Sequence, residues 1–327
     1  MRYESILETI GKTPLVRLNH LVRGLKPTIY AKLEYFNPGG SIKDRIALRM
    51  IEAAEKEGRL RPGGTIIEGT SGNTGIGLAL VAALKGYKAV FTITDKQSPE
   101  KISLLRALGA EVIVCPTAVA PEDPRSYYSV AAKLARDTEN SFYPDQYGNP
   151  ENPRTHYLST GPEIWEDTGG RVTYFVAGAG TGGTLSGAGR FLKEKNSNIR
   201  LIAADPAGSL YHDKFHYGKV GEAKPYVIEG IGEDIFPKTM DLSLLDDVIR
   251  VEDKDAFLMT LRLAREEGIF AGGSSGAAVW AGLAAARELS EGDLMVILLP
   301  DTGMRYLSKI YSDSWMREMG YVPGRGR

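Results

Sequence analysis

The sequence predicts an α/β protein of two doubly wound, mostly parallel-sheet domains that share a cleft. Short runs rich in β-branched residues alternate with longer segments whose apolar residues recur every three or four positions. Glycine-rich turns stand between several of these runs and the helices expected after them. The chain has 327 residues, which is enough for two domains with a hydrophobic core each.

The first half of the chain contains one strand–helix series. Strands are expected at residues 28–36, 65–69, 88–94 and 110–114, and helices at residues 41–60, 75–86, 98–109 and 123–139. The first helix carries Ile42, Ile46 and Met50 on one face, because a spacing of four residues returns to the same side of a helix. This order favours parallel strands joined by helical crossovers.

The segment 140–157 interrupts this alternation with three prolines and three asparagines, which is typical of a domain boundary or crossover. A second series follows, with strands expected at residues 171–177, 199–205 and 293–300 and helices at residues 184–196, 254–268 and 276–289. Residues 207–240 show no periodicity and are expected to form surface loops. We expect a smaller domain of residues 41–145 and a larger one made of residues 1–40 and 146–327.

The overall charge excludes a strongly basic or acidic protein. The 40 Lys and Arg balance 41 Asp and Glu, so composition predicts neither a nucleic-acid nor a membrane partner. No stretch reaches the roughly 18 apolar residues of a membrane span. The single cysteine, Cys115, lies in an apolar run and is expected to be a buried thiol. We expect a soluble cytoplasmic protein.

Four glycine-rich stretches lie where a turn leads into a helix. They are NPGGS at 37–41, GTSGNTG at 69–75, GAGTGGT at 178–184 and AGGSSG at 271–276. Glycine lets the backbone approach a ligand, and the first N–H groups of a helix can bind an anion. Such turns also occur without a ligand, but four together indicate binding sites for two anionic groups.

The third stretch leaves an alternative open. Gly178, Gly180 and Gly183 match the G-x-G-x-x-G pattern after a strand, and Asp205 ends the next strand, where a ribose-binding acid could lie. A dinucleotide-dependent oxidoreductase would use this turn. That alternative gives no task to the TSGNTG stretch or to Lys43.

Lys43 follows the glycine pair of the first stretch. If Ser41 is the N-cap and Asp44, at the third helical position, completes a capping box with it, Lys43 lies in the first turn. The helix dipole and burial would both lower the pKa of its amine, as a lysine that binds an aldehyde requires. A solvent-facing lysine is the plainer interpretation. A phosphorylated aldehyde with an amino-acid substrate would use both anion sites, so pyridoxal phosphate fits better than a dinucleotide.

NPGGSIKDR, TSGNTG and GAGTGGT in combination resemble the fold-type II pyridoxal-phosphate enzymes, which include cysteine synthase and cystathionine β-synthase. The resemblance covers nearly the whole chain and implies a fold like that of the tryptophan synthase β subunit, with the cofactor between the domains. It implies an internal aldimine on Lys43. The cofactor phosphate would lie on Gly180, Thr181, Gly182, Gly183 and Thr184, the ring hydroxyl on Asn73, the pyridine nitrogen on Ser274, and the substrate carboxylate on Thr70, Ser71, Thr74 and Gln146.

The activity implied by the resemblance is β-replacement on L-serine or an activated serine through an α-aminoacrylate. Within the family, EGIGED at 229–234 and the terminal pattern with Asp301 lean toward cystathionine β-synthase, whose nucleophile is homocysteine. Cysteine synthase, acting on O-acetylserine or O-phosphoserine with sulfide, is the alternative. Gly69 and the segment 94–101 differ from the residues that the family usually has near the substrate.

The resemblance also implies a homodimer acting on small amino-acid and thiol or sulfide substrates. We expect the chain to correspond to the catalytic core, without the haem-binding extension or regulatory domain pair of animal relatives, so haem dependence and S-adenosylmethionine activation are not expected. His212 and His216 could share a helix face, but no third ligand accompanies them and no metal site is expected. His156 is expected to form hydrogen bonds in the crossover loop rather than take part in the chemistry.

Overall fold

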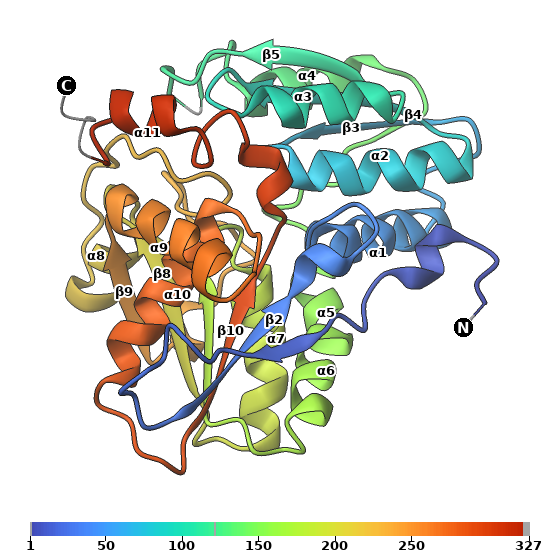
Figure 1. Ribbon diagram of the computed structural model, residues 1–327. Coiled ribbons are helices and arrows are strands. Elements are labelled where there is room, and N and C mark those ends of the chain that lie inside the picture. The colour runs from blue at the N-terminus through green and yellow to red at the C-terminus, as the bar shows by residue number, and fades with distance from the viewer. Residues whose placement is uncertain (1, 121, 323–327) are drawn as a thin grey trace.

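The computed structural model describes residues 2–120 and 122–322 and contains two β-sheets flanked by helices (Figure 1). The strands are β1 Leu15–Arg17, β2 Thr28–Leu33, β3 Thr65–Gly69, β4 Lys88–Thr94, β5 Glu111–Cys115, β6 Ser141–Phe142, β7 Tyr174–Gly178, β8 Arg200–Pro206, β9 Asp247–Val251 and β10 Leu294–Leu299. The α-helices are α1 Lys43–Lys56, α2 Asn73–Lys85, α3 Pro99–Ala107, α4 Tyr127–Asp137, α5 Glu151–Leu158, α6 Thr160–Asp167, α7 Gly183–Lys195, α8 Tyr211–Tyr217, α9 Asp253–Glu266, α10 Gly273–Ala286 and α11 Asp313–Glu318.

The larger sheet has the strand order β1-β2-β10-β7-β8-β9. Only β1 pairs antiparallel with its neighbour, and the other pairs are parallel. Strand β10 is central and buried at all six of its positions, as expected for a parallel strand covered on both faces. One face packs against α6 and α7, and the other against α9 and α10.

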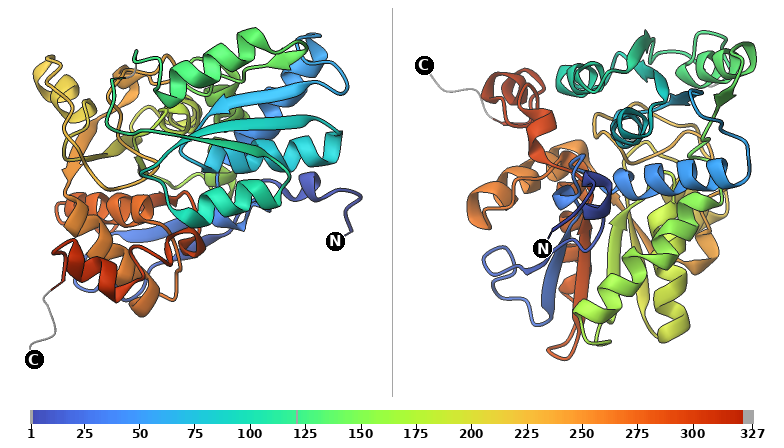
Figure 2. Two further views of the ribbon diagram at one scale, coloured as in Figure 1. Left: turned by 90° about the horizontal axis from the view of Figure 1, so that it is seen from above. Right: turned by 90° about the vertical axis from the view of Figure 1, so that its right-hand side faces the viewer.

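The smaller sheet has the order β5-β4-β3-β6 and is parallel throughout. Helices α1, α2 and α3 bury their apolar faces against it, and α4 covers β3 and β4 from the other side. Helix α1 packs on α2 and also on α5, so it lies between the two sheets (Figures 1 and 2). The predicted fold class is therefore confirmed, and we propose that residues 41–145 and the remainder of the chain form separate domains around the two sheets.

Two sequence predictions about local structure need correction. Residues 207–240 are not simply surface loops, because they contain α8 and because Ile228 and Ile231 are buried in the core. The apolar residues of this segment lie in irregular turns and are not spaced as in a helix or a strand. The sequence pattern therefore did not indicate that they are buried. His156 lies on α5 rather than in a loop, and its imidazole is fully buried beside Thr160.

The carboxyl ends of the parallel strands place the glycine-rich turns together. Strand β3 leads into the turn before α2, and β7 leads into the turn before α7. The loop before α1 is joined to the end of β10, since the N–H of Ile42 donates to the carbonyl of Pro300 at 2.9 Å. Ligand sites in open parallel sheets lie at such strand ends, so these turns are where a site is expected.

Candidate active site

Lys43 lies in the first turn of α1, as predicted, but it is the first helical residue and the N-cap is Ile42 rather than the expected Ser41. The Ser41 hydroxyl accepts the N–H of Lys43 itself at 3.3 Å, and the Asp44 carboxylate accepts the N–H of Gly39 at 2.6 Å. Asp44 therefore closes the NPGG turn onto the helix. The Lys43 side chain lines two neighbouring cavities, one of about 630 Å³ and one of about 40 Å³.

The electrostatic setting of Lys43 favours a reactive amine. Burial lowers the pKa of Lys43 to about 8, although the carboxylates of Glu233 and Asp301 act to raise it. The side chain is open to the cavities, which keeps it accessible to a small ligand. A lysine with this pKa has a substantial neutral fraction near neutral pH, as covalent attachment to an aldehyde requires.

We expect the attachment of an aldehyde to Lys43 to follow this pKa. When cofactor-free protein is mixed with pyridoxal phosphate and trapped with borohydride, the rate of labelling at Lys43 should rise with pH with a midpoint near 8. The sign follows because only the neutral amine attacks, and it predominates above its pKa. An ordinary exposed lysine would give a midpoint near ~10.4. Peptide mapping of the labelled protein measures the rate, and a midpoint at that ordinary value would contradict the burial effect.

The turn of residues 180–184 begins α7 and lines the smaller cavity. Gly182 has φ of 80°, a left-handed conformation that favours glycine. A Cβ atom at Gly182 would clash with Met240, and one at Gly183 would clash with Asn152. The glycines therefore let the backbone close tightly at a helix N-terminus, where the first N–H groups have no partner within the helix. Such a turn can hold a phosphate.

Neighbouring side chains hold this turn rigidly. The Asn152 amide donates to the Thr181 hydroxyl at 3.0 Å, and the Tyr211 hydroxyl donates to the carbonyl of Gly180 at 2.6 Å. The Thr184 hydroxyl lies 3.4 Å from Nε2 of His156. Asn152 and Tyr211 gave no sequence signal of this role, because each comes from an element far from the turn in sequence.

Asn73 and Ser274 line the smaller cavity together with Lys43. The Asn73 amide donates to Asp301 at 2.9 Å, and its oxygen accepts a hydrogen bond from Arg305, so its orientation is set by the segment after β10. Ser274 lies in the first turn of α10, where Gly272 is the N-cap. No hydrogen-bond partner of its hydroxyl occurs in the described parts of the chain, which leaves that hydroxyl available to a ligand.

The predicted carboxylate-binding residues do not all face the same space. Ser71 and Gln146 line the larger cavity, and the Thr74 hydroxyl donates to Gln146 at 2.6 Å. Thr70 is fully buried, and its hydroxyl accepts the N–H groups of Gly72 and Gly75 at 3.0 and 3.2 Å. The structure therefore brings Ser71, Thr74 and Gln146 together, while the Thr70 side chain supports the start of α2.

A buried ion pair closes one side of the larger cavity. Glu229 accepts hydrogen bonds from Lys101 at 2.7 Å and from Lys309 at 2.6 Å. Although burial raises the pKa of Glu229, the two lysines lower it overall, so the carboxylate stays ionised. This contact joins α3 of the smaller sheet to the EGIGED segment and to the C-terminal part of the chain.

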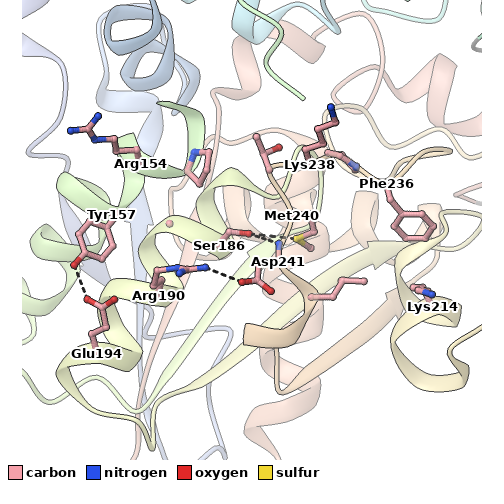
Figure 3. A pocket seen from close by; sticks show the side chains of 15 residues that line it. Arg154, Tyr157, Ser186, Arg190, Glu194, Lys214, Phe236, Lys238, Met240 and Asp241 are labelled. Carbon is pink, nitrogen blue, oxygen red and sulfur yellow. Dashed lines mark hydrogen bonds and ion pairs between the residues drawn. The ribbon is translucent and has the colours of Figure 1, made fainter. Parts of the chain in front are cut away.

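A second large cavity, of about 780 Å³, lies beside α7 (Figure 3). Arg190 reaches Asp241 across its wall at 2.9 Å, and Tyr157 reaches Glu194 at 2.7 Å. Its lining includes Thr239, whose hydroxyl donates to the carbonyl of Thr181 at 2.5 Å. None of the site residues predicted from sequence lines this cavity, whereas several of them line the two cavities at Lys43, where we place the candidate site.

The remaining predicted polar positions lie outside the site. Cys115 is buried, as expected. His212 and His216 share α8 with ring centroids 4.5 Å apart, and no group of three or more metal-ligating side chains was found within residues 2–120 and 122–322. Asp205 is buried, one of its oxygens accepts the N–H of His212 at 2.9 Å, and it does not line the smaller cavity at the GAGTGGT turn.

Comparison with protein families decides between the two cofactor interpretations. The family described as pyridoxal-phosphate dependent enzyme matches residues 6–301. The chain belongs to this family. The pyridoxal-phosphate enzymes use that cofactor as an electron sink, and Lys43, the rigid glycine turn and the free hydroxyl of Ser274 form a site whose chemistry fits it. The oxidoreductase alternative has no such support.

Curated relatives of this pyridoxal-phosphate enzyme include several cystathionine β-synthases. The protein from Apis mellifera is 49% identical over 320 residues, which cover 97% of this chain and 63% of the relative. That from Dictyostelium discoideum is 46% identical, covering 98% of this chain and 64% of the relative. The chain thus spans somewhat less than two thirds of the length of these relatives.

Solved structures show the same fold. A hydrogen sulfide-producing enzyme from Fusobacterium nucleatum is 40% identical with a TM-score of 0.87, covering 94% of this chain and 100% of the other. A lysine-to-alanine variant of O-ureido-L-serine synthase, with O-ureido-L-serine bound, is 38% identical with a TM-score of 0.88, covering 99% of this chain and 100% of the other. No helix of this pyridoxal-phosphate enzyme, in the part that the structure describes, has the length and apolar character needed to span a membrane.

Proposed function

We propose that this pyridoxal-phosphate enzyme replaces the β-substituent of L-serine, or of an activated serine, with the sulfur of homocysteine to form cystathionine. The observation that carries the proposal is the position of Lys43 between a phosphate-sized cavity at the glycine turn and a cavity of about 630 Å³. The larger volume lies within the ~300–1,000 Å³ of small-molecule sites. A cavity of this volume suits a second amino acid as nucleophile, whereas sulfide would fill only a small part of it. The cystathionine β-synthases among the relatives favour the same nucleophile.

The cofactor, when bound, would withdraw electrons from Cα of the amino acid. The side chains around it would then have separate tasks. Lys43 is the base that removes the proton from Cα, since its pKa of about 8 lets it both accept and release a proton near neutrality. The helix turn at 180–184 would hold the phosphate, and Ser274 would offer a neutral hydroxyl to the ring nitrogen. Asn73, which is oriented by its hydrogen bond to Asp301, would bind the ring hydroxyl.

Binding of the amino-acid carboxylate is assigned to the start of α2 and to Gln146. The Ser71 hydroxyl and the first N–H groups of α2 are donors at a helix N-terminus, where a negative charge is favoured. Thr74 orients the Gln146 amide through their hydrogen bond at 2.6 Å. Thr70 contributes by supporting this turn, not by direct contact.

Steady-state assays with paired substrates test the proposal. Purified protein with pyridoxal phosphate should form cystathionine from serine and homocysteine, identified by mass spectrometry, with kcat/KM at least about tenfold above that for O-acetylserine or O-phosphoserine with sulfide. Tenfold corresponds to ~1.4 kcal/mol of transition-state discrimination. A preference for acetylserine with sulfide would instead assign the chain to cysteine synthesis.

The proposal extends to the setting of the reaction. We infer a homodimer acting in the cytoplasm in transsulfuration and cysteine biosynthesis, because the family resemblance implies it. Light scattering on purified protein tests the dimer, and a monomer at working concentration would contradict it.

A further inference from the structure

Glu233 lines the larger cavity, and the reaction proposed above gives it no task. Only 9% of its surface is exposed. Its backbone N–H donates to the Ser209 hydroxyl at 3.0 Å, but its carboxylate has no hydrogen-bond or ion-pair partner within residues 2–120 and 122–322. A buried carboxylate without a partner is costly, so this one is suited to a ligand that supplies the missing partner.

The neighbouring acid shows the contrast. Glu229, four residues earlier, is neutralised by the ammonium groups of Lys101 and Lys309 at 2.7 and 2.6 Å. Glu233 faces Lys43 and Lys96 only at longer range, and Asp234 and Asp205 add negative charge around it. Burial and these two acids raise the pKa of Glu233 to about 8, although Lys43 and Lys96 act to lower it. A cation placed beside it would favour the ionised form.

Tyrosines surround this carboxylate. Tyr127, Tyr128, Tyr147 and Tyr226 all line the same cavity. The rings of Tyr127 and Tyr128 have centroids 3.9 Å apart, and Tyr147 meets Tyr128 edge-on at 5.5 Å. Burial and the charge of Glu233 raise the pKa of Tyr128, Tyr147 and Tyr226, so their hydroxyls stay neutral. Aromatic rings beside a carboxylate are the chemistry that binds an ammonium group.

A positive group lies in the same cavity. Lys96 places its ammonium 4.3 Å from the ring centroid of Tyr226. The lining of the cavity therefore includes acidic groups, Glu233 and Asp234, and a basic group, Lys96. The head group of an amino acid carries an ammonium and a carboxylate, and it matches this arrangement. Sulfide, which is anionic near neutrality, gains nothing from Glu233.

We propose that Glu233 binds the ammonium group of an amino-acid thiol that enters as the second substrate, and that it thereby selects such a thiol over sulfide. This inference rests on the β-replacement proposed above and names a residue that sets its nucleophile. A hydrogen bond to a charged group is worth ~1.5–3 kcal/mol, which corresponds to about ten- to a hundredfold in affinity.

Two thiols that differ only in the amino group test this assignment. Homocysteine and 4-sulfanylbutanoate are compared as second substrates, with serine as first substrate, on the pyridoxal-phosphate-loaded enzyme. Glu233→Gln keeps the shape and removes the charge, and Glu233→Asp keeps the charge. Glu291→Gln is the matched control, because Glu291 is exposed on the turn before β10. Urea denaturation midpoints establish that each variant is folded.

The wild type should prefer homocysteine at least about tenfold, and Glu233→Gln should raise the KM for homocysteine about tenfold or more. In Glu233→Gln, the KM for 4-sulfanylbutanoate and the KM for serine should change less than twofold. Glu233→Asp should retain most of the preference for homocysteine, and Glu291→Gln should behave as the wild type. Equal losses with both thiols would indicate a structural or proton-transfer role and overturn the assignment, as would an unchanged KM. A wild type active with sulfide but with neither thiol would overturn it while leaving β-replacement intact. A wild type inactive with every nucleophile would overturn both.

Discussion

Replacing Lys43 with alanine is expected to lower kcat by about a thousandfold or more, because in the function proposed above one amine both binds the cofactor covalently and moves the proton at Cα. General acid–base catalysis alone contributes ~10²–10⁴-fold. The visible absorption of the cofactor bound through Lys43, which borohydride fixes to the protein, should also be lost. Turnover with serine and homocysteine and mass spectrometry of the reduced protein measure the two effects.

A second lysine of the same helix provides the control for this variant. Lys56 ends α1 and is exposed, so Lys56→Ala should leave both the spectrum and kcat unchanged. The Lys43→Ala protein should still fold, since the Lys43 side chain makes no hydrogen bond within the described residues. If Lys43→Ala retained wild-type turnover, the role assigned to this amine would be wrong.

Replacing Arg45 with methionine is expected to lower the free energy of unfolding by ~3–5 kcal/mol, because it leaves a buried acid without its main partner. The guanidinium donates to Glu34 at 2.7 Å and to Glu163 at 2.6 Å. Glu34 is fully buried, so water cannot replace the lost contact. Although burial raises the pKa of Glu163, Arg45 and, to a smaller extent, Lys32 and the N–H of Lys12 lower it to about 2, so this carboxylate is ionised in the pair.

Urea denaturation of cofactor-free protein measures this loss directly. Arg59→Met is the matched control, because Arg59 pairs with Glu57 at the surface, where both side chains are about half exposed, and surface pairs contribute ~0–1 kcal/mol. Since Arg45 lies two residues after Lys43 on α1, the variant should also bind pyridoxal phosphate more weakly. Equal stability of the two variants would show that the buried network adds nothing.

Much of the fold could be predicted because burial on one or both faces leaves a regular pattern in sequence. The strands at 65–69 and 88–94 have the predicted bounds, and α1 begins two residues after its predicted start. Residues 207–240 were missed because contacts between distant segments, not a period, bury them. Glu229 is an example, since Lys101, one of its partners, lies 128 residues away.

Some features of the candidate site could likewise be predicted from the sequence, and others could not. Sequence pattern alone indicated Lys43 in the first turn of a helix and a glycine-rich turn at 178–184, because both features depend on neighbouring residues. Nothing local indicated that Asp301 and Arg305 orient Asn73, or that tyrosines from three segments line the cavity with Glu233. Thr70 illustrates the limit, since its motif position was evident while the direction of its side chain was not.

The amino-acid sequence by itself therefore determined the secondary structure that periodic burial produces, the glycines that permit tight turns and the amine available for chemistry. Only the tertiary structure decided how that amine is tuned and which side chains line the cavity beside it. The physical reason is that desolvation and charge act through space. They depend on distances between side chains such as Lys43 and Glu233, which are far apart along the chain and close together only after folding.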